Sequence, residues 1–219
     1  QQPFLATALM RLPVREVPDA SWCPTAATDG YHIFYNPRWV STLRDGELRG
    51  LLAHEVLHVL FSHSGRCGAR QKMRWNVACD YAINLLLVQR GFRLPKGGLI
   101  SEEAKGKTAE QIYAELPGWP ALPVQGKKIS GKGAPDNAAP QQVDETQDQV
   151  PQVGDDLLDP DDPRVRPMRS ADAPDRERMD ELRRELRDDA MARLTGEGGA
   201  AFRQECDADD ARQIGRAHV

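Results

Sequence analysis

The sequence has few cysteines and no clustering among them. Its four, Cys23, Cys67, Cys79 and Cys206, are too scattered for a C-x-x-C zinc knuckle and too few for a disulfide-stapled scaffold. We therefore expect reduced thiols and a cytoplasmic location. The chain also lacks any apolar run of about 18 residues, the length that a membrane-crossing helix needs, so no membrane span is predicted.

Charge is unevenly distributed but is nowhere concentrated. Residues 1–100 carry twelve Lys/Arg and seven Asp/Glu, whereas residues 121–219 carry fifteen and twenty-two. The net charge of −4 thus combines a weakly basic first part with an acidic last part. Neither part has the basic stripe that is typical of nucleic-acid binding, so we expect no nucleic-acid partner.

Two histidines and a glutamate stand inside an apolar run. His54, Glu55 and His58 have the H-E-x-x-H spacing, within a helix predicted over about residues 46–62. Side chains four residues apart share one helical face, so both imidazoles can bind one zinc ion. Glu55 can then accept a proton from the reacting water without binding the metal. The competing interpretation is that both histidines are hydrogen-bonded core residues and Glu55 is solvated.

Catalytic zinc takes a third protein ligand, and a second helix offers one. This helix, predicted over about residues 73–90, is largely apolar but carries Asn76, Asp80 and Asn84 at four-residue intervals. A carboxylate in an apolar helix has to be paired, hydrogen-bonded or bound to a metal. If the two helices are antiparallel, Asp80 faces the histidines, and we predict that it is the third ligand. The alternatives are a hydrogen bond to a ligating imidazole or a pair with Arg74.

Four further polar residues are expected near the metal without binding it. His63 lies half a turn from the His54 side if its helix continues, which gives it a supporting role. Asn76 and Asn84 are predicted to form hydrogen bonds in helix packing or to substrate. Tyr81 and His63 are the candidates for stabilising an oxyanion, and the sequence does not decide between them.

The remaining elements of the first 120 residues are short. Helical spacing predicts a helix over residues 4–12, and residues 14–17 read as a strand. Asp29-Gly30 lies between two β-prone runs and predicts a hairpin. Asp45 is the predicted N-cap of the H-E-x-x-H helix and Gly65 its predicted end. The expected fold class is α+β, mostly helical and zincin-like, with a small N-terminal sheet beside the H-E-x-x-H helix.

These segments resemble a known family. Residues 54–63 and 75–84, together with residues 94–98 and the helix that begins at Thr108, are similar to the bacterial metallopeptidase domain that commonly precedes a von Willebrand factor A-like domain. The resemblance covers about residues 1–118. It implies a zincin-like fold, a peptide or protein substrate, a following von Willebrand factor A-like domain and a MoxR-type AAA ATPase as partner.

Composition divides the chain into three parts. Residues 1–120 are the predicted metallopeptidase domain. Residues 121–175 are rich in Pro, Gly, Gln and Asp and poor in large apolar residues, so we predict a disordered linker. Residues 176–219 predict an amphipathic helix followed by a truncated tail. Its expected apolar stripe and terminating glycines are Met179, Leu182, Leu186, Met191, Leu194, Gly196, Gly198 and Gly199.

Since the chain starts at Gln1 and its last six residues read like translated adapter sequence, we expect a fragment that lacks its C-terminal domain.

The leading hypothesis is a zinc-dependent metallopeptidase in which His54, His58 and Asp80 bind Zn²⁺ and Glu55 is the general base. Two alternatives stay open. The first is a non-catalytic, zinc-stabilised adaptor that presents a peptide groove and works with a MoxR-type ATPase. The second is a metal-free fold with structural histidines.

Overall fold

The computed structural model describes residues 3–18, 22–116, 157–168 and 174–217. Within these ranges the chain is mostly helical and has one small three-stranded sheet. The α-helices are α1 (Pro3–Arg11), α2 (Pro37–Val40), α3 (Asp45–Leu60), α4 (His63–Arg66), α5 (Lys72–Gln89), α6 (Ala109–Glu115), α7 (Arg176–Arg193) and α8 (Gly196–Ala217). The strands are β1 (Val14–Glu16), β2 (Ala26–Thr28) and β3 (Ile33–Tyr35), and two 3-10 turns are η1 (Glu102–Ala104) and η2 (Arg166–Met168).

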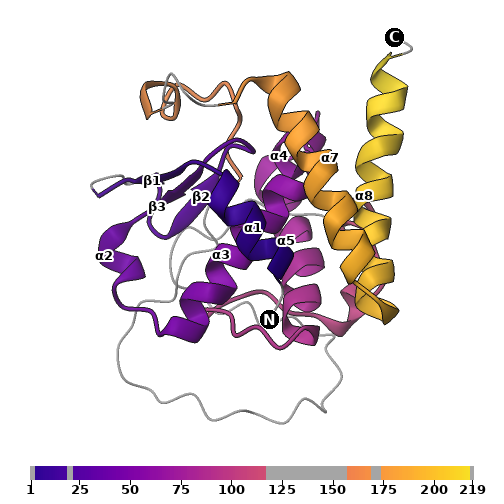
Figure 1. The fold of residues 1–219 in the computed structure, drawn as a ribbon, viewed down its shortest axis with the longest axis horizontal. Coiled ribbons are helices and arrows are strands. Elements are labelled where there is room, and N and C mark those ends of the chain that lie inside the picture. The colour runs from indigo at the N-terminus through magenta and orange to yellow at the C-terminus, as the bar shows by residue number, and fades with distance from the viewer. Residues whose placement is uncertain (1–2, 19–21, 117–156, 169–173, 218–219) are drawn as a thin grey trace.

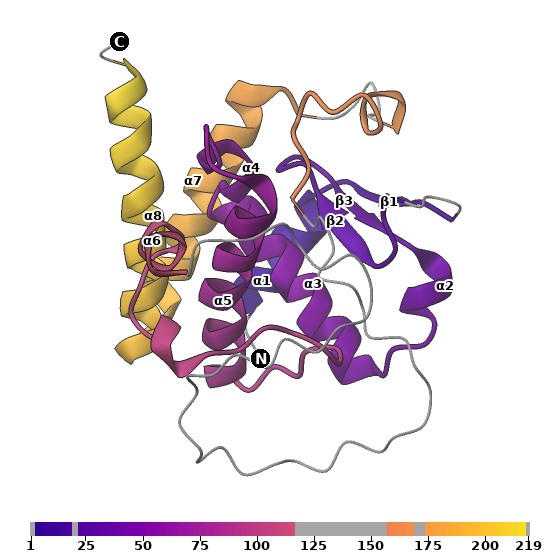
Figure 2. The same cartoon turned by 180° about the vertical axis from the view of Figure 1, so that it is seen from behind.

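The helices α3 and α5 occupy the middle of the molecule (Figure 1). The sheet lies on one side of them, and α7 and α8 lie side by side on the other (Figures 1 and 2). The helix α1 covers one face of the α3–α5 pair, and α6 covers the opposite face (Figure 2). The largest core cluster joins all these helices except α6, and it includes Phe4, Leu57, Leu60, Ile83, Leu87, Met179, Leu186 and Phe202.

The sheet contains the predicted hairpin. β2 and β3 are antiparallel, with Thr28 opposite Ile33, so that prediction is confirmed. In the turn, the Asp29 carboxylate accepts the backbone N–H groups of Tyr31 and His32 at 2.8 and 2.7 Å. β1 pairs in parallel with the other edge of β3, and β2 packs on α3. His32 is buried, and its Nδ1 lies 3.2 Å from Asp29 Oδ2.

The helix α3 is buried on almost every side. From Gly50 to Leu60, every residue except Leu52 is buried. Gly50 permits a very close approach of the chain after α5, because a Cβ placed there would lie 1.9 Å from the carbonyl oxygen of Arg93. A helix this enclosed holds the side chains it carries in fixed positions.

The predicted N-cap of this helix is wrong by one residue, and its predicted end is wrong by several. Arg44, not Asp45, is the N-cap, and its backbone N–H is bound by the carboxylate of Glu47 at 2.9 Å. At the other end α3 stops at Leu60, and Ser62 has a left-handed backbone with φ of 53°. Gly65, the expected end, lies inside α4. The chain therefore turns before His63 instead of continuing as one helix.

The C-terminal region forms two helices where the sequence predicts one. In α7 the predicted stripe faces the core, with Met179, Leu182 and Leu186 buried. The glycines that were expected to end the helical region instead lie at the start of α8, and Gly196 has a positive φ of 67°. The two helices pack on each other, and between them they contact α1, α3 and α5.

Part of the predicted linker is ordered against the core. Within residues 157–168, the side chains of Leu157, Leu158 and Val165 are buried. The backbone N–H of Leu158 donates to the carbonyl oxygen of Thr28 at 2.8 Å, which extends the edge of the sheet. Residues 121–156 and 169–173 of that predicted linker lie outside the described residues.

Two further observations concern the fold as a whole. Among the described helices, none combines the length and the apolar character that crossing a membrane requires. All four cysteines are free thiols, and three of them, Cys23, Cys79 and Cys206, are buried.

Candidate metal centre

The structure places His54 and His58 on one face of α3. Their ring centroids are 4.4 Å apart, and their Nε2 atoms are separated by 2.8 Å. Both side chains are almost fully buried. The four-residue spacing thus brings two metal-binding atoms to one point at the centre of the molecule.

The helix α5 brings Asp80 to the same point. Asp80 Oδ1 lies 3.3 Å from His58 Nε2 and 3.6 Å from His54 Nε2. One turn further along α5, Asn84 contacts His54, so the later residue of α5 meets the earlier residue of α3. The two helices therefore run antiparallel, as the assignment of Asp80 requires.

The three atoms form a triangle of a suitable size for a metal ion. All three residues are buried, and their candidate ligand atoms lie within 4.8 Å of one another. With sides of 2.8, 3.3 and 3.6 Å, the point equidistant from the three atoms is about 1.9 Å from each. Zinc binds imidazole nitrogen and carboxylate oxygen at about 2.0–2.2 Å. The donors therefore fit a zinc-sized cation with little movement.

Two buried carboxylates at this point have no Lys or Arg partner in the described part of the chain. Within that part, Asp80 Oδ1 and Glu55 Oε2 are buried and accept no hydrogen bond. Burial raises the pKa of Asp80 to about 6, against the opposing pull of His54. Burial, and then the charge of Asp80, hold the pKa of Glu55 well above its usual range. A bound cation would supply the positive charge that both carboxylates lack.

The histidines are held in the form that binds metals. Burial, and then the neighbouring His58, lower the pKa of His54 to about 4. Burial, and then His63, lower the pKa of His58 well below its usual value. Both rings are therefore neutral at pH 7, and a neutral imidazole offers a lone pair to a metal ion.

Asn84 determines which nitrogen of His54 faces the centre. Its Oδ1 lies 2.8 Å from His54 Nδ1, while its Nδ2 donates to the carbonyl oxygen of Leu99 at 3.0 Å. Because the amide donates to Leu99, its oxygen is the atom that faces His54, so His54 Nδ1 carries the proton. His54 Nε2 is then left with its lone pair directed at the point between the three candidate ligand atoms.

The other three residues that were predicted to lie near the metal have different surroundings. His63 Nδ1 is 3.1 Å from His58 Nδ1, on the side of that ring away from Asp80. Asn76 is buried one turn before Asp80 on α5. Tyr81 is half-buried and packs against the cluster of Ala78, Leu85, Ala104 and Ile112, which joins α5, η1 and α6.

Three arginines that the sequence analysis did not single out hold the end of α3. They donate to three successive backbone carbonyls: Arg183 to Val59 at 3.0 Å, Arg187 to Leu60 at 2.5 Å, and Arg66 to Phe61 at 3.0 Å. The last carbonyls of a helix lack partners within it, and cations there also complement the helix dipole. The only sequence signal is that Arg183 and Arg187 are four residues apart, each next to a residue of the apolar stripe on α7.

Comparison with known proteins identifies a family for this chain. A family model described as "putative metallopeptidase domain" matches residues 1–211. The chain belongs to this family. The match extends past the 118 residues on which the sequence resemblance rests, and it includes α7 and most of α8 of this metallopeptidase-family domain. No curated protein and no solved structure matches the chain.

Proposed function

We propose that this metallopeptidase-family protein is a zinc-dependent peptidase with a zincin-like fold. The observation that carries the proposal is the convergence of His54 Nε2, His58 Nε2 and Asp80 Oδ1 on one buried point, with the buried Glu55 next to His54 on α3. Two imidazoles and one carboxylate are a donor set that suits catalytic zinc, and three protein ligands leave a position for water.

Each residue has a separate role in this proposal. A bound zinc ion makes water acidic near neutral pH and polarises a carbonyl group. His54, His58 and Asp80 hold the ion, and Asn84 keeps His54 oriented toward it. Glu55 accepts a proton from the attacking water and returns it to the leaving amine. Tyr81 stays the candidate for stabilising the oxyanion, because both ring nitrogens of His63 face other side chains, those of His58 and Glu205.

The test is the variant Glu55→Gln. It removes the proposed base but none of the three ligands, so we expect zinc content equal to wild type and a loss of at least about 100-fold in peptide hydrolysis. Cleavage of a broad peptide library, with a chelator control, measures the activity. Wild-type rates in Glu55→Gln would contradict the role of Glu55.

The same assay separates the adaptor alternative. A wild-type protein that binds zinc but shows no chelator-sensitive cleavage of any peptide would favour a non-catalytic, zinc-stabilised module. A partnership with a MoxR-type ATPase and a von Willebrand factor A-like domain stays a prediction from the family resemblance.

A further inference from the structure

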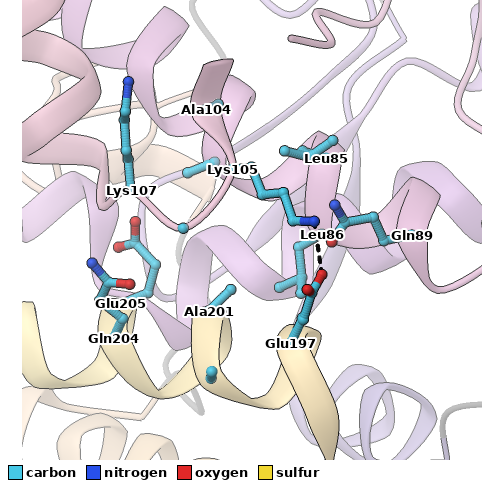
Figure 3. Close-up of a pocket in the computed structure, with 13 residues that line it drawn as sticks. Leu85, Leu86, Gln89, Ala104, Lys105, Lys107, Glu197, Ala201, Gln204 and Glu205 are labelled. Atoms are coloured by element: carbon cyan, nitrogen blue, oxygen red, sulfur yellow. Dashed lines mark ion pairs between the residues drawn. The ribbon is translucent and has the colours of Figure 1, made fainter. Parts of the chain in front are cut away.

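Glu205 is a buried carboxylate on α8, and it lies on the side of His63 that is away from His58. Its Oε2 accepts a hydrogen bond from Arg66 Nη1 at 2.7 Å, and its Oε1 accepts the backbone N–H of Ala109 at 2.7 Å. Figure 3 shows it among the residues that line a pocket of about 220 Å³ between α5, the Ala104–Lys107 turn and α8. The side chain is nevertheless only 5% exposed, so its contacts are internal.

His63 connects Glu205 to a proposed zinc ligand. His63 Nε2 lies 3.6 Å from Glu205 Oε2, and His63 Nδ1 lies 3.1 Å from His58 Nδ1. In the described part of the chain, His63 Nε2 has no hydrogen-bond partner at normal distance, and Glu205 is the carboxylate placed beside it. Glu205, His63 and His58 thus form a continuous row of side chains from α8 to the candidate metal centre.

If His58 binds a metal, only one placement of the ring protons gives each contact between His58, His63 and Glu205 one donor and one acceptor. The atom of His58 that faces His54 and Asp80 is Nε2, so Nε2 must present its lone pair and the ring proton must be on Nδ1. That proton is donated to His63 Nδ1. A neutral His63 then carries its own proton on Nε2, where it points at the carboxylate of Glu205.

We propose that Glu205 is a positioning residue of the metal centre: through His63 it fixes the ring orientation and the tautomer of His58. The inference rests on the proposed metal-binding function. It assigns a role at the site to α8, which lies in the region where the sequence predicts only a truncated tail. Arg66 supports the same arrangement, since it binds both Glu205 and the end of α3.

A matched pair of variants tests this role. Glu205→Gln keeps the size of the side chain but removes its charge and leaves one acceptor oxygen for three donors, His63, Arg66 and the backbone N–H of Ala109. Glu110→Gln is the control, because Glu110 also binds Arg66 but forms no hydrogen bond or ion pair with His63 in the described structure. We expect Glu205→Gln to bind zinc about 10–100-fold more weakly than wild type in a chelator competition, and Glu110→Gln to bind it within about threefold.

The results separate the two proposals. If wild type binds no zinc, the proposed function fails, and this inference fails with it. If wild type binds zinc and Glu205→Gln binds it equally well, only the role of Glu205 is overturned. Equal weakening by both variants would likewise overturn it, because the loss would then come from Arg66 and not from His63.

A measurement on the wild type does not depend on how the variants fold. Long-range ¹H–¹⁵N correlation spectra of the zinc-loaded protein report which ring nitrogen of each histidine carries the proton. We expect the proton of His58 on Nδ1 and that of His63 on Nε2. A His63 ring protonated on Nδ1 and bare on Nε2 would overturn the proposal.

Discussion

Arg187 provides the strongest predicted effect on stability, because it joins α7 and α8 to the helix that carries the histidines. Its Nε donates to the carbonyl oxygen of Leu60, and its Nη2 donates to Asp209 Oδ2 at 2.6 Å and to Ser62 Oγ at 3.3 Å. The side chains of Arg187 and Asp209 are 5% and 4% exposed. The pair is therefore shielded from solvent, unlike most ion pairs on a protein surface.

The magnitude follows from what Arg187→Met leaves behind. Removing one partner of a buried ion pair strands the other charge and costs about 3–5 kcal/mol. The freed carbonyl of Leu60 adds to this loss, although Gln213 still donates to Asp209 at 3.1 Å. We expect Arg187→Met to lower the free energy of unfolding by about 4 kcal/mol, a large fraction of the roughly 5–15 kcal/mol of a typical domain.

Urea denaturation, followed by far-ultraviolet circular dichroism and by tryptophan fluorescence, measures the effect. The control is Arg193→Met on the same helix, because Arg193 pairs with Asp189 on the surface and its loss should cost less than about 0.5 kcal/mol. The double variant Arg187→Met/Asp209→Leu removes the stranded carboxylate, so it should be more stable than Arg187→Met alone. If Arg187→Met unfolds within about 1 kcal/mol of the control, the assigned role of this buried pair is wrong.

Three shorter predictions concern other parts of the molecule. Gly50→Ala should lower the melting temperature or prevent folding, because its Cβ would lie 1.9 Å from the carbonyl oxygen of Arg93; an unchanged thermal melt would contradict the close approach. Burial raises the pKa of Asp29, but hydrogen bonds from His32 and neighbouring backbone more than offset this, so the net pKa lies below its usual value. Asp29 therefore stabilises the fold above about pH 4, and this contribution is lost as the pH falls through the lowered pKa. At pH 7, Asp29→Ala should lower the free energy of unfolding by roughly 2 kcal/mol. Urea titrations should show this loss becoming smaller between pH 7 and pH 3. Asn84→Ala should weaken zinc binding about 10–100-fold in a chelator competition, whereas Asn84→Asp, which keeps an acceptor for His54 Nδ1, should weaken it less.

Local spacing was sufficient to predict that His54, His58 and Asp80 come together. The four-residue interval between His54 and His58 fixes their common face, and the isolated carboxylate of Asp80 in an apolar helix points to a buried partner. The hairpin at Asp29 and the start of a helix at Thr108 depend on neighbouring residues alone, and both are present. Such features need no knowledge of the rest of the chain.

The residues that the sequence analysis missed act across long separations. Arg187 contacts Leu60, and Glu205 contacts Arg66, over more than a hundred residues, so no local pattern connects them. The glycines at the start of α8 also misled the prediction, because only packing on α5 and α7 makes a helix favourable there. Similarly, Leu157 and Leu158 become core residues only once the edge of the sheet is in place.

X-ray absorption at the zinc edge, combined with metal analysis, tests the central claim most directly. We predict about one zinc ion per chain, bound by two imidazole nitrogens and at least one oxygen at about 2.0–2.2 Å, and loss of that ion in the Asp80→Ala variant. A wild-type protein that binds no zinc, or an Asp80→Ala variant that keeps the ion with an unchanged spectrum, would contradict the assignment of His54, His58 and Asp80 as the metal ligands.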